Sequence, residues 1–121
     1  MGHALAREGV VTVIPSYRLH PEVKIKEQLE DLIQVIKWTK ANIESFDGDK
    51  NKIFLSGHSA GGHLITLLGM DPELRSKHAT PIRGLIPLSA IWDLEMFMKN
   101  GEEEIRQEVI PTHFGKTKDK L

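Results

Sequence analysis

The sequence predicts an α/β fold in which helices cover both faces of a parallel sheet, giving three layers (αβα). Three short apolar stretches, at residues 10–14, 52–56 and 82–89, alternate with segments whose apolar residues recur at helical spacing. Strands that are joined through helices form right-handed crossovers, and these place helices on both sides of a parallel sheet. A serine flanked by glycines follows the second stretch, and ligands of such sheets gather at the carboxyl ends of strands.

The beginning of the chain predicts a helix and then a strand. Residues 4–8 are expected to end a helix, with Gly9 in the C-cap position. Residues 10–14 (Val-Val-Thr-Val-Ile) are β-branched throughout and apolar except at Thr12, which suits a strand buried on both faces. Pro15 cannot donate to a ladder and therefore ends this predicted strand.

A long amphipathic helix is predicted over residues 22–45, with Pro21 at its first turn. Its apolar positions recur at helical spacing: Ile25, Leu29, Leu32, Ile33, Ile36 and Ile43. Its charged residues mostly occupy the other side and predict a solvated face rather than a binding patch. Residues 47–51 (Asp-Gly-Asp-Lys-Asn) predict a polar turn. Their alternating acids also suit a calcium loop, but the bidentate glutamate that closes such a loop is missing.

The second half of the chain continues the alternation. A helix is predicted over residues 62–69 and a short one over 71–77, followed by the third strand at 82–89. Pro87 cannot donate to a ladder, so this strand is expected to be bulged or to lie at an edge of the sheet. Two further helices and a polar, fraying end are expected at residues 92–98, 102–109 and 112–121.

The pattern Gly57-x-Ser59-x-Gly61 predicts a nucleophile elbow. A serine hydroxyl is a weak nucleophile, so catalysis requires it to stand free of the fold beside a base and oxyanion donors. We expect the two glycines to remove side chains that would clash where the strand turns sharply into a helix. Ser59 is therefore the candidate nucleophile. Ala60 is the candidate oxyanion donor through its backbone N–H, which lies at the positive end of the coming helix.

Composition narrows the function classes. The chain has 121 residues, enough for one modest domain, and its 16 basic and 17 acidic residues give a net charge of −1. This balance gives no electrostatic case for a nucleic acid or an anionic membrane as a partner. The absence of cysteine excludes disulfides, thiolate catalysis and cysteine-based zinc sites, and it fits a cytoplasmic location. We see no signal peptide and no apolar run that could span a bilayer, and we expect no cofactor.

Four motifs in order carry a resemblance to a known family. They are Tyr17-Arg18-Leu19-x-Pro21, Phe46-Asp47-Gly48-Asp49, Gly57-His58-Ser59-Ala60-Gly61-Gly62-His63 and Ser89-Ala90-Ile91-Trp92-Asp93-Leu94. With them, residues 10–94 resemble the middle of an α/β-hydrolase. The similarity is to hormone-sensitive-lipase-like esterases and to kynurenine formamidases, isoprenylcysteine methylesterases and feruloyl-type esterases. The resemblance implies a serine esterase with Ser59 as nucleophile and Ala60 as one oxyanion donor.

The chain also departs from that family. The family takes further oxyanion donors from an upstream His-Gly-Gly-type loop, and its triad acid and histidine follow the serine on later strands. Neither part is visible, so we expect residues 1–121 to form a single partial α/β-hydrolase domain. Asp93 follows the next strand and could supply the acid, although a helix cap is the stronger interpretation. His113 is the only histidine after it, and no strand pattern holds it against Ser59.

Other polar residues near the motif have simpler interpretations. His58 and His63 flank the serine and are expected to be packing or supporting residues. A metal site made of these two histidines and Asp71 does not match helical ligand spacing. Tyr17 and Arg18 could touch substrate, but we favour a structural hydrogen-bonding role at the strand end.

Two hypotheses of function follow. In the first, the chain carries the elbow of a serine hydrolase that cleaves a small ester or amide through an acyl-enzyme on Ser59, with low activity when alone. In the second, it is a catalytically silent hydrolase-like fragment that acts, if at all, by binding a partner. A sheet of few strands leaves its edges unpaired, so self-association through these edges is also expected.

Overall fold

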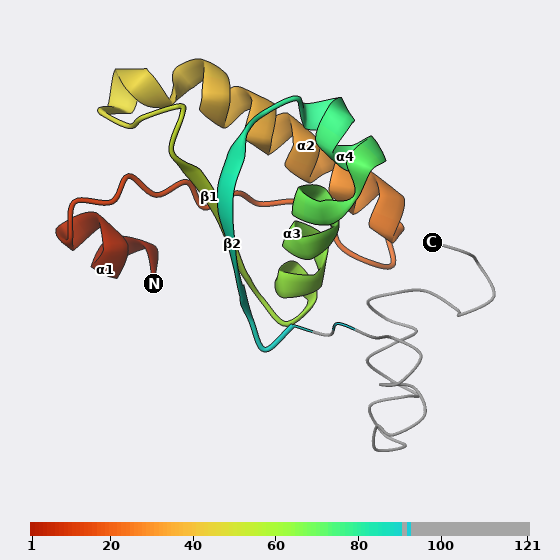
Figure 1. Ribbon diagram of the computed structural model, residues 1–121. Helices are drawn as coiled ribbons and strands as arrows, with labels where there is room; N and C mark the ends of the chain where they lie inside the picture. The colour runs from red at the N-terminus through yellow and green to blue at the C-terminus, as the bar shows by residue number, and fades with distance from the viewer. Residues whose placement is uncertain (91, 93–121) are drawn as a thin grey trace.

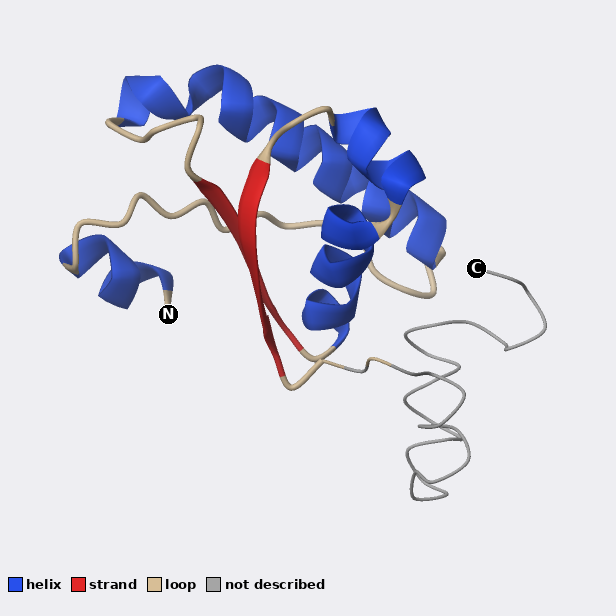
Figure 2. Ribbon diagram, viewed as in Figure 1, coloured by secondary structure: helices blue, strands red, loops and turns tan. Residues whose placement is uncertain are grey.

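The computed structural model describes residues 1–90 and residue 92. Within this range two parallel strands, β1 (Ile53–His58) and β2 (Ile82–Leu88), form one sheet. The helices are α1 (Gly2–Arg7), α2 (Ile25–Asn42), the 3-10 helix η1 (Ile43–Phe46), α3 (Ala60–Met70) and α4 (Pro72–His78). Figures 1 and 2 show α3 and α4 on one side of the strands and α1 on the other. The described residues thus have the expected α/β organisation, in which helices lie on both sides of a parallel sheet as in part of a three-layer (αβα) domain.

The register of the sheet explains how β2 accommodates its proline. His58 pairs with Leu88 and Gly57 with Pro87, and the irregularity in the ladder falls at the other end, between Ile53 and Phe54. The Ser59 N–H donates to the Leu88 carbonyl at 2.9 Å, so Leu88 turns its backbone groups towards β1. Successive residues of a strand alternate between its edges, so Pro87 turns to the free outer edge, where no ladder donor is needed.

The strand predicted at residues 10–14 is not present. These residues run as an extended segment without ladder bonds to any described strand. Val10, Val11, Val13 and Ile14 are between 37% and 73% exposed. Their β-branched side chains favour an extended backbone, but a strand also needs a hydrogen-bonded neighbour, and none of the described segments supplies one. The prediction of a buried strand was therefore wrong.

Helix α2 begins later than predicted. Pro21 lies before the helix, not in its first turn, because Lys24 keeps an extended backbone (ψ 172°) and serves as the N-cap. The Glu27 carboxylate accepts the Lys24 backbone N–H at 3.0 Å, which closes a capping box. At the other end the helix tightens into η1 and stops at Asp47, whose φ of 64° is left-handed.

The core lies between α2 and α3. It is built from five buried side chains: Leu29, Ile33, Ile36, Leu64 and Leu68. Tyr17, Leu55 and Ile82 pack around it, so the loop before α2 and both strands share one apolar centre with the two helices. Burial of this centre is the main source of stability for the described unit.

His78 joins the end of α4 to its neighbours. The side chain is 3% exposed, and its Nε2 lies 3.0 Å from the carbonyl of Leu68 in α3. Its Nδ1 accepts the backbone N–H of Thr80 at 3.1 Å, so the ring proton sits on Nε2 and is donated to Leu68. This buried ring fixes the point at which the chain enters β2.

The helices predicted at residues 92–98 and 102–109, together with the polar end at 112–121, lie outside the described residues except for Trp92. In the part of the chain that is described, no helix is both long and apolar enough to cross a membrane.

Candidate active site at the end of β1

Ser59 stands at the tip of a sharp turn between β1 and α3. Its φ and ψ are 52° and −116°, a left-handed conformation that L residues rarely adopt and that costs about 1–3 kcal/mol. The backbone is held on both sides, because its N–H donates to Leu88 and its carbonyl accepts the His63 N–H at 3.1 Å. The side chain makes no helix-capping hydrogen bond and the residue is exposed. The turn therefore leaves the hydroxyl available at the carboxyl end of the sheet.

The glycines around Ser59 do not all act as predicted. A Cβ on Gly57 would lie 2.4 Å from the carbonyl oxygen of Gly61, so any side chain there would strike the first turn of α3. A Cβ on Gly61 would meet no atom of the described residues within 4 Å. The expectation that the motif glycines prevent a clash is confirmed for Gly57, whereas no described residue requires a glycine at position 61.

Gly62 supplies a close approach that the motif alone did not predict. A Cβ at this position would lie 2.7 Å from the Cβ of Ala90 and 3.1 Å from the carbonyl oxygen of Gly57. The chain after β2 therefore folds directly against the first turn of α3. Ser89, which directs it there, is left-handed like Ser59, with φ 49°. The sequence signal was the doublet Gly61-Gly62, in which the second glycine carries the steric requirement.

Ala60 is the first residue of α3 and is half-buried. The first N–H groups of an α-helix have no partner inside the helix, and the helix dipole places partial positive charge around them. Gly61 and Gly62 continue this turn without side chains. The arrangement can stabilise negative charge that develops next to Ser59, while the role of Ala60 as oxyanion donor stays a prediction.

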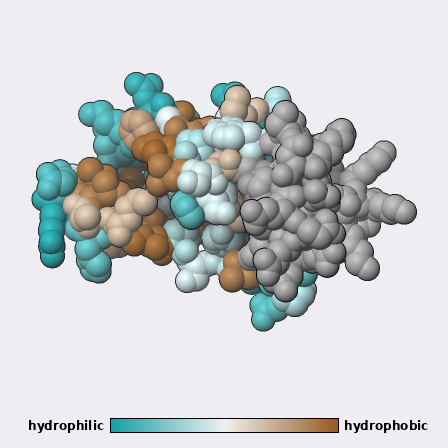
Figure 3. Space-filling view, turned by 90° about the horizontal axis from the view of Figure 1, so that it is seen from below, coloured by the Kyte–Doolittle hydropathy of each residue, from teal (hydrophilic) through white to brown (hydrophobic). Residues whose placement is uncertain are grey.

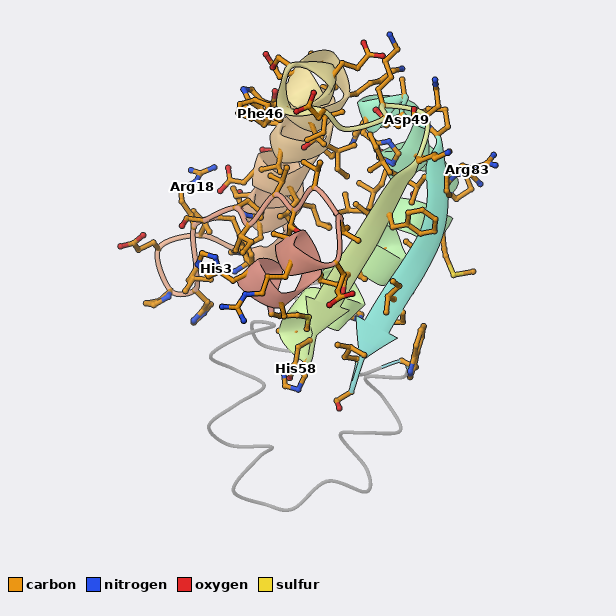
Figure 4. All side chains as sticks on the ribbon, turned by 90° about the vertical axis from the view of Figure 1, so that its left-hand side faces the viewer. His3, Arg18, Phe46, Asp49, His58 and Arg83 are labelled. Carbon is orange, nitrogen blue, oxygen red and sulfur yellow. The ribbon has the colours of Figure 1, made fainter. Side chains whose placement is uncertain are left out.

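The histidines next to the elbow occupy different environments. His58 is exposed at the lower end of β1 in Figure 4, whereas His63 is 8% exposed within α3. The two other residues considered for catalysis, Asp93 and His113, lie outside the described residues. No hydrogen bond joins the Ser59 hydroxyl to another residue within the described range. The described structure therefore presents a nucleophile candidate without assigning its base.

Tyr17 and Arg18 hold the loop before α2 in place. Tyr17 packs against the core. Arg18 donates three hydrogen bonds to the Asp31 carboxylate of α2, from its backbone N–H (3.1 Å), Nε (2.9 Å) and Nη2 (2.7 Å). Figure 4 shows Arg18 beside α2, well away from His58 at the elbow end of β1. These contacts agree with the prediction that Tyr17 and Arg18 have a structural role and do not contact substrate.

The Arg18–Asp31 pair predicts a change of stability in acid. The hydrogen bonds from Arg18 lower the pKa of Asp31 below its ordinary value of 3.8. The ion pair therefore contributes in full above about pH 4, and its contribution is lost as the pH falls through the lowered pKa. We expect Asp31→Asn to lower the thermal midpoint at pH 7 and to lower it less at about pH 2.5. Scans of both proteins by circular dichroism test this.

Glu22→Gln is the control for this comparison, because Glu22 is exposed near the same loop and forms no ion pair with a described residue. Its midpoint should follow that of the parent chain at every pH. An Asp31→Asn difference that stays constant from neutral pH to acid would contradict the proposed linkage.

Asp71 is the N-cap of α4. Its Oδ1 accepts the backbone N–H groups of Glu73 (2.8 Å) and Leu74 (3.0 Å). Among the described side chains, no group of three or more His, Asp or Glu residues could hold a metal ion.

The sequence is similar to known proteins of one fold family. The profile of a family described as the alpha/beta hydrolase fold matches residues 2–117. The chain is 37% identical over 76 residues to Esterase LipC of Mycobacterium tuberculosis, covering 60% of this chain and 19% of the relative. It is 37% identical over 87 residues to Versiconal hemiacetal acetate esterase of Dothistroma septosporum, covering 69% and 26%. Isoprenylcysteine alpha-carbonyl methylesterase ICME of Arabidopsis thaliana is 36% identical over 64 residues, covering 53% and 15%.

The chain thus spans about a quarter or less of the length of these curated relatives. No solved structure matches it significantly. The family match extends over nearly the whole sequence and includes the strand, the left-handed serine and the helix that follows it. The chain therefore belongs to the alpha/beta-hydrolase fold family.

Proposed function

We propose that this chain carries the nucleophile elbow of a serine hydrolase that cleaves carboxylic esters, or the related amides, through an acyl-enzyme on Ser59. The observation that carries the proposal is the left-handed Ser59, held by backbone hydrogen bonds on both sides while its hydroxyl is exposed. Strain of this kind is concentrated at functional sites. The esterase names of the relatives favour an ester as the substrate class.

The reaction would proceed in two steps. The Ser59 oxygen attacks the carbonyl carbon, a base takes the hydroxyl proton, and the negative charge moves to the carbonyl oxygen. The Ala60 N–H donates to this oxygen from the first turn of α3, where the helix dipole adds to the stabilisation. The intermediate then expels the alcohol, which takes up the proton. Water finally attacks the acyl-enzyme and releases the acid.

We further propose that the 121-residue chain turns over slowly by itself. The described residues place no base within hydrogen-bond reach of the Ser59 hydroxyl, and loss of a triad partner lowers turnover by roughly 10⁴-fold. Ready hydrolysis of p-nitrophenyl acetate by the purified chain, abolished by Ser59→Ala, would overturn this part of the proposal. The alternative is a chain that is catalytically silent and acts by binding a partner.

Covalent labelling tests the nucleophile separately from turnover. We expect a fluorophosphonate to add slowly to the chain and to modify Ser59, since the oxyanion donors assist phosphonylation as they assist acylation. Intact-mass measurement and peptide mapping identify the modified residue. Ser59→Ala should remain unlabelled.

Ser89→Ala is the matched control, because Ser89 is also a left-handed, exposed serine that directly follows a strand. This variant should still be labelled at Ser59. Failure of the parent chain to react, or equal labelling of Ser59 and Ser89, would contradict the assignment of the nucleophile.

A further inference from the structure

The chain that follows β2 closes against the first turn of α3. The Ser59 N–H donates to the Leu88 carbonyl at 2.9 Å, and a little further along Ala90 lies against Gly62. Between them Ser89 has a φ of 49°, so the backbone turns sharply from the strand onto the helix. The end of β2 therefore touches both the candidate nucleophile and the helical turn that follows it.

The end of β1 encloses the same turn. A Cβ on Gly62 would lie 2.7 Å from the Ala90 Cβ and also 3.1 Å from the carbonyl oxygen of Gly57. A Cβ on Gly57 would in turn lie 2.8 Å from the Gly62 nitrogen. The backbone at Gly62 is thus in contact with the chain ends of both strands, and a single methyl group has no room there.

This constraint is confined to one glycine of the doublet. Gly62 is buried, whereas Gly61 is half-buried and a Cβ on it would meet no described atom within 4 Å. Figure 3 views the molecule from the side on which both strands end, and the middle of the surface there is pale, the colour of residues of intermediate hydropathy such as glycine and serine. The position of the turn therefore depends on the contact of Gly62 with Ala90.

The turn that Ala90 touches carries the proposed oxyanion donor. The Ser59 carbonyl accepts the His63 N–H at 3.1 Å, and the Thr66 hydroxyl donates to the Gly62 carbonyl at 2.8 Å, so these bonds hold the first turns of α3 together. A shift of Gly62 therefore carries the Ala60 N–H with it. An oxyanion donor acts only when it lies about 2.7–3.1 Å from the oxygen that becomes negative. A small displacement of the turn is enough to remove this stabilisation.

We propose that Ala90 is a positioning residue for the acyl transfer at Ser59. Its methyl group rests against Gly62 and holds the first turn of α3 where the Ala60 N–H faces the developing oxyanion. Ala90 acts through Gly62 and not through contact with the substrate. The inference rests on the proposed function, because it assigns how the oxyanion donor of that site is held in place.

A steric exchange between positions 62 and 90 tests the contact. We expect Gly62→Ala to slow fluorophosphonate labelling of Ser59 by roughly 100-fold, the effect of misplacing a catalytic group by about 1 Å. In Gly62→Ala/Ala90→Gly the new methyl group takes the room of the old one, and about tenfold of the rate should return. Recovery stays partial because the Gly57 carbonyl oxygen still lies 3.1 Å from the new Cβ. Intact mass against time gives the rates, with Gly61→Ala as the matched control that labels at the parent rate.

Ala90→Gly alone provides a second test, since it removes the contact without adding an atom that could disturb the fold. We expect labelling to slow by about tenfold, because the first turn of α3 is no longer held at Gly62. The amide proton of Ala60 gives a direct signature in spectra of chain carrying isotope-labelled alanine. In the parent chain this proton should move downfield when the phosphonyl adduct forms, because it then donates to the phosphonyl oxygen. In Ala90→Gly the movement should be smaller.

Ile36→Val separates positioning from a general loss of stability. Ile36 is a buried core residue of α2, outside the elbow, and its truncation should lower the urea midpoint while the labelling rate and the Ala60 signal stay at their parent values. A parent chain that does not react at Ser59 would overturn the proposed function and this inference with it. If the parent reacts and Ala90→Gly reacts equally fast with the full Ala60 movement, the inference alone is wrong. It is also wrong if Ala90→Gly fails to relieve the effect of Gly62→Ala.

Discussion

Gly57→Ala is expected to destabilise the chain by about 3 kcal/mol and to abolish phosphonate labelling of Ser59. The new Cβ would lie 2.4 Å from the carbonyl oxygen and 2.5 Å from the carbonyl carbon of Gly61, which are backbone atoms and cannot turn aside. Relief requires the end of β1 to move away from α3, and this movement would open the turn that holds Ser59 left-handed. Urea unfolding followed by circular dichroism gives the stability, and intact mass gives the labelling.

Gly61→Ala is the control that makes this prediction specific. A methyl group there meets no described atom within 4 Å, and an alanine in a helix is more favourable than glycine by about 0.5–1 kcal/mol. We expect unchanged or slightly raised stability and labelling at the parent rate. If the two alanine variants behaved alike, the steric account of the elbow would be wrong.

The elbow could be predicted from the sequence because its determinants are local. Gly57, Ser59 and the start of α3 lie within a few residues, so one short pattern contains both the strand-to-helix turn and the serine it exposes. The pattern could not show which atoms lie close to each glycine. The contact of Gly62 with Ala90 joins the ends of two strands, and it exists only once β2 lies beside β1.

The segment 10–14 shows the opposite case. Its β-branched residues correctly predict an extended backbone, but a strand is defined by its neighbour, which local preference cannot specify. The prediction of β2 was correct because its partner β1 lies one helical crossover earlier in the chain, so the two strands pair in parallel.

His78 could not be found by pattern at all. Nothing in Lys77-His78-Ala79-Thr80 distinguishes a buried imidazole from an exposed one. Its burial follows from the turn at Asp71, which lays α4 against α3 so that the ring reaches the Leu68 carbonyl. Such a residue is fixed by the packing of elements, and the sequence predicts only the elements.

Leu68→Ala is expected to destabilise the chain by about 3–5 kcal/mol, the range for a fully buried leucine whose surroundings cannot collapse into the cavity. Leu68 is 1% exposed at the centre of the core, where α3 meets Leu29, Ile33 and Ile36 of α2. Since a small domain has only about 5–15 kcal/mol of total stability, the loss removes much of the folded population. The urea midpoint followed by circular dichroism should fall accordingly.

Met70→Ala provides the matched control, because Met70 lies two residues further along the same helix but is 66% exposed. Its truncation removes little buried surface and should change stability by less than about 0.5 kcal/mol. Leu68→Met keeps most of the volume and should cost less than about 1.5 kcal/mol. Equal effects of Leu68→Ala and Met70→Ala would mean that α3 does not pack on α2 in solution. The elbow at the start of α3 would then have no fixed support, and the strained conformation of Ser59 could not persist.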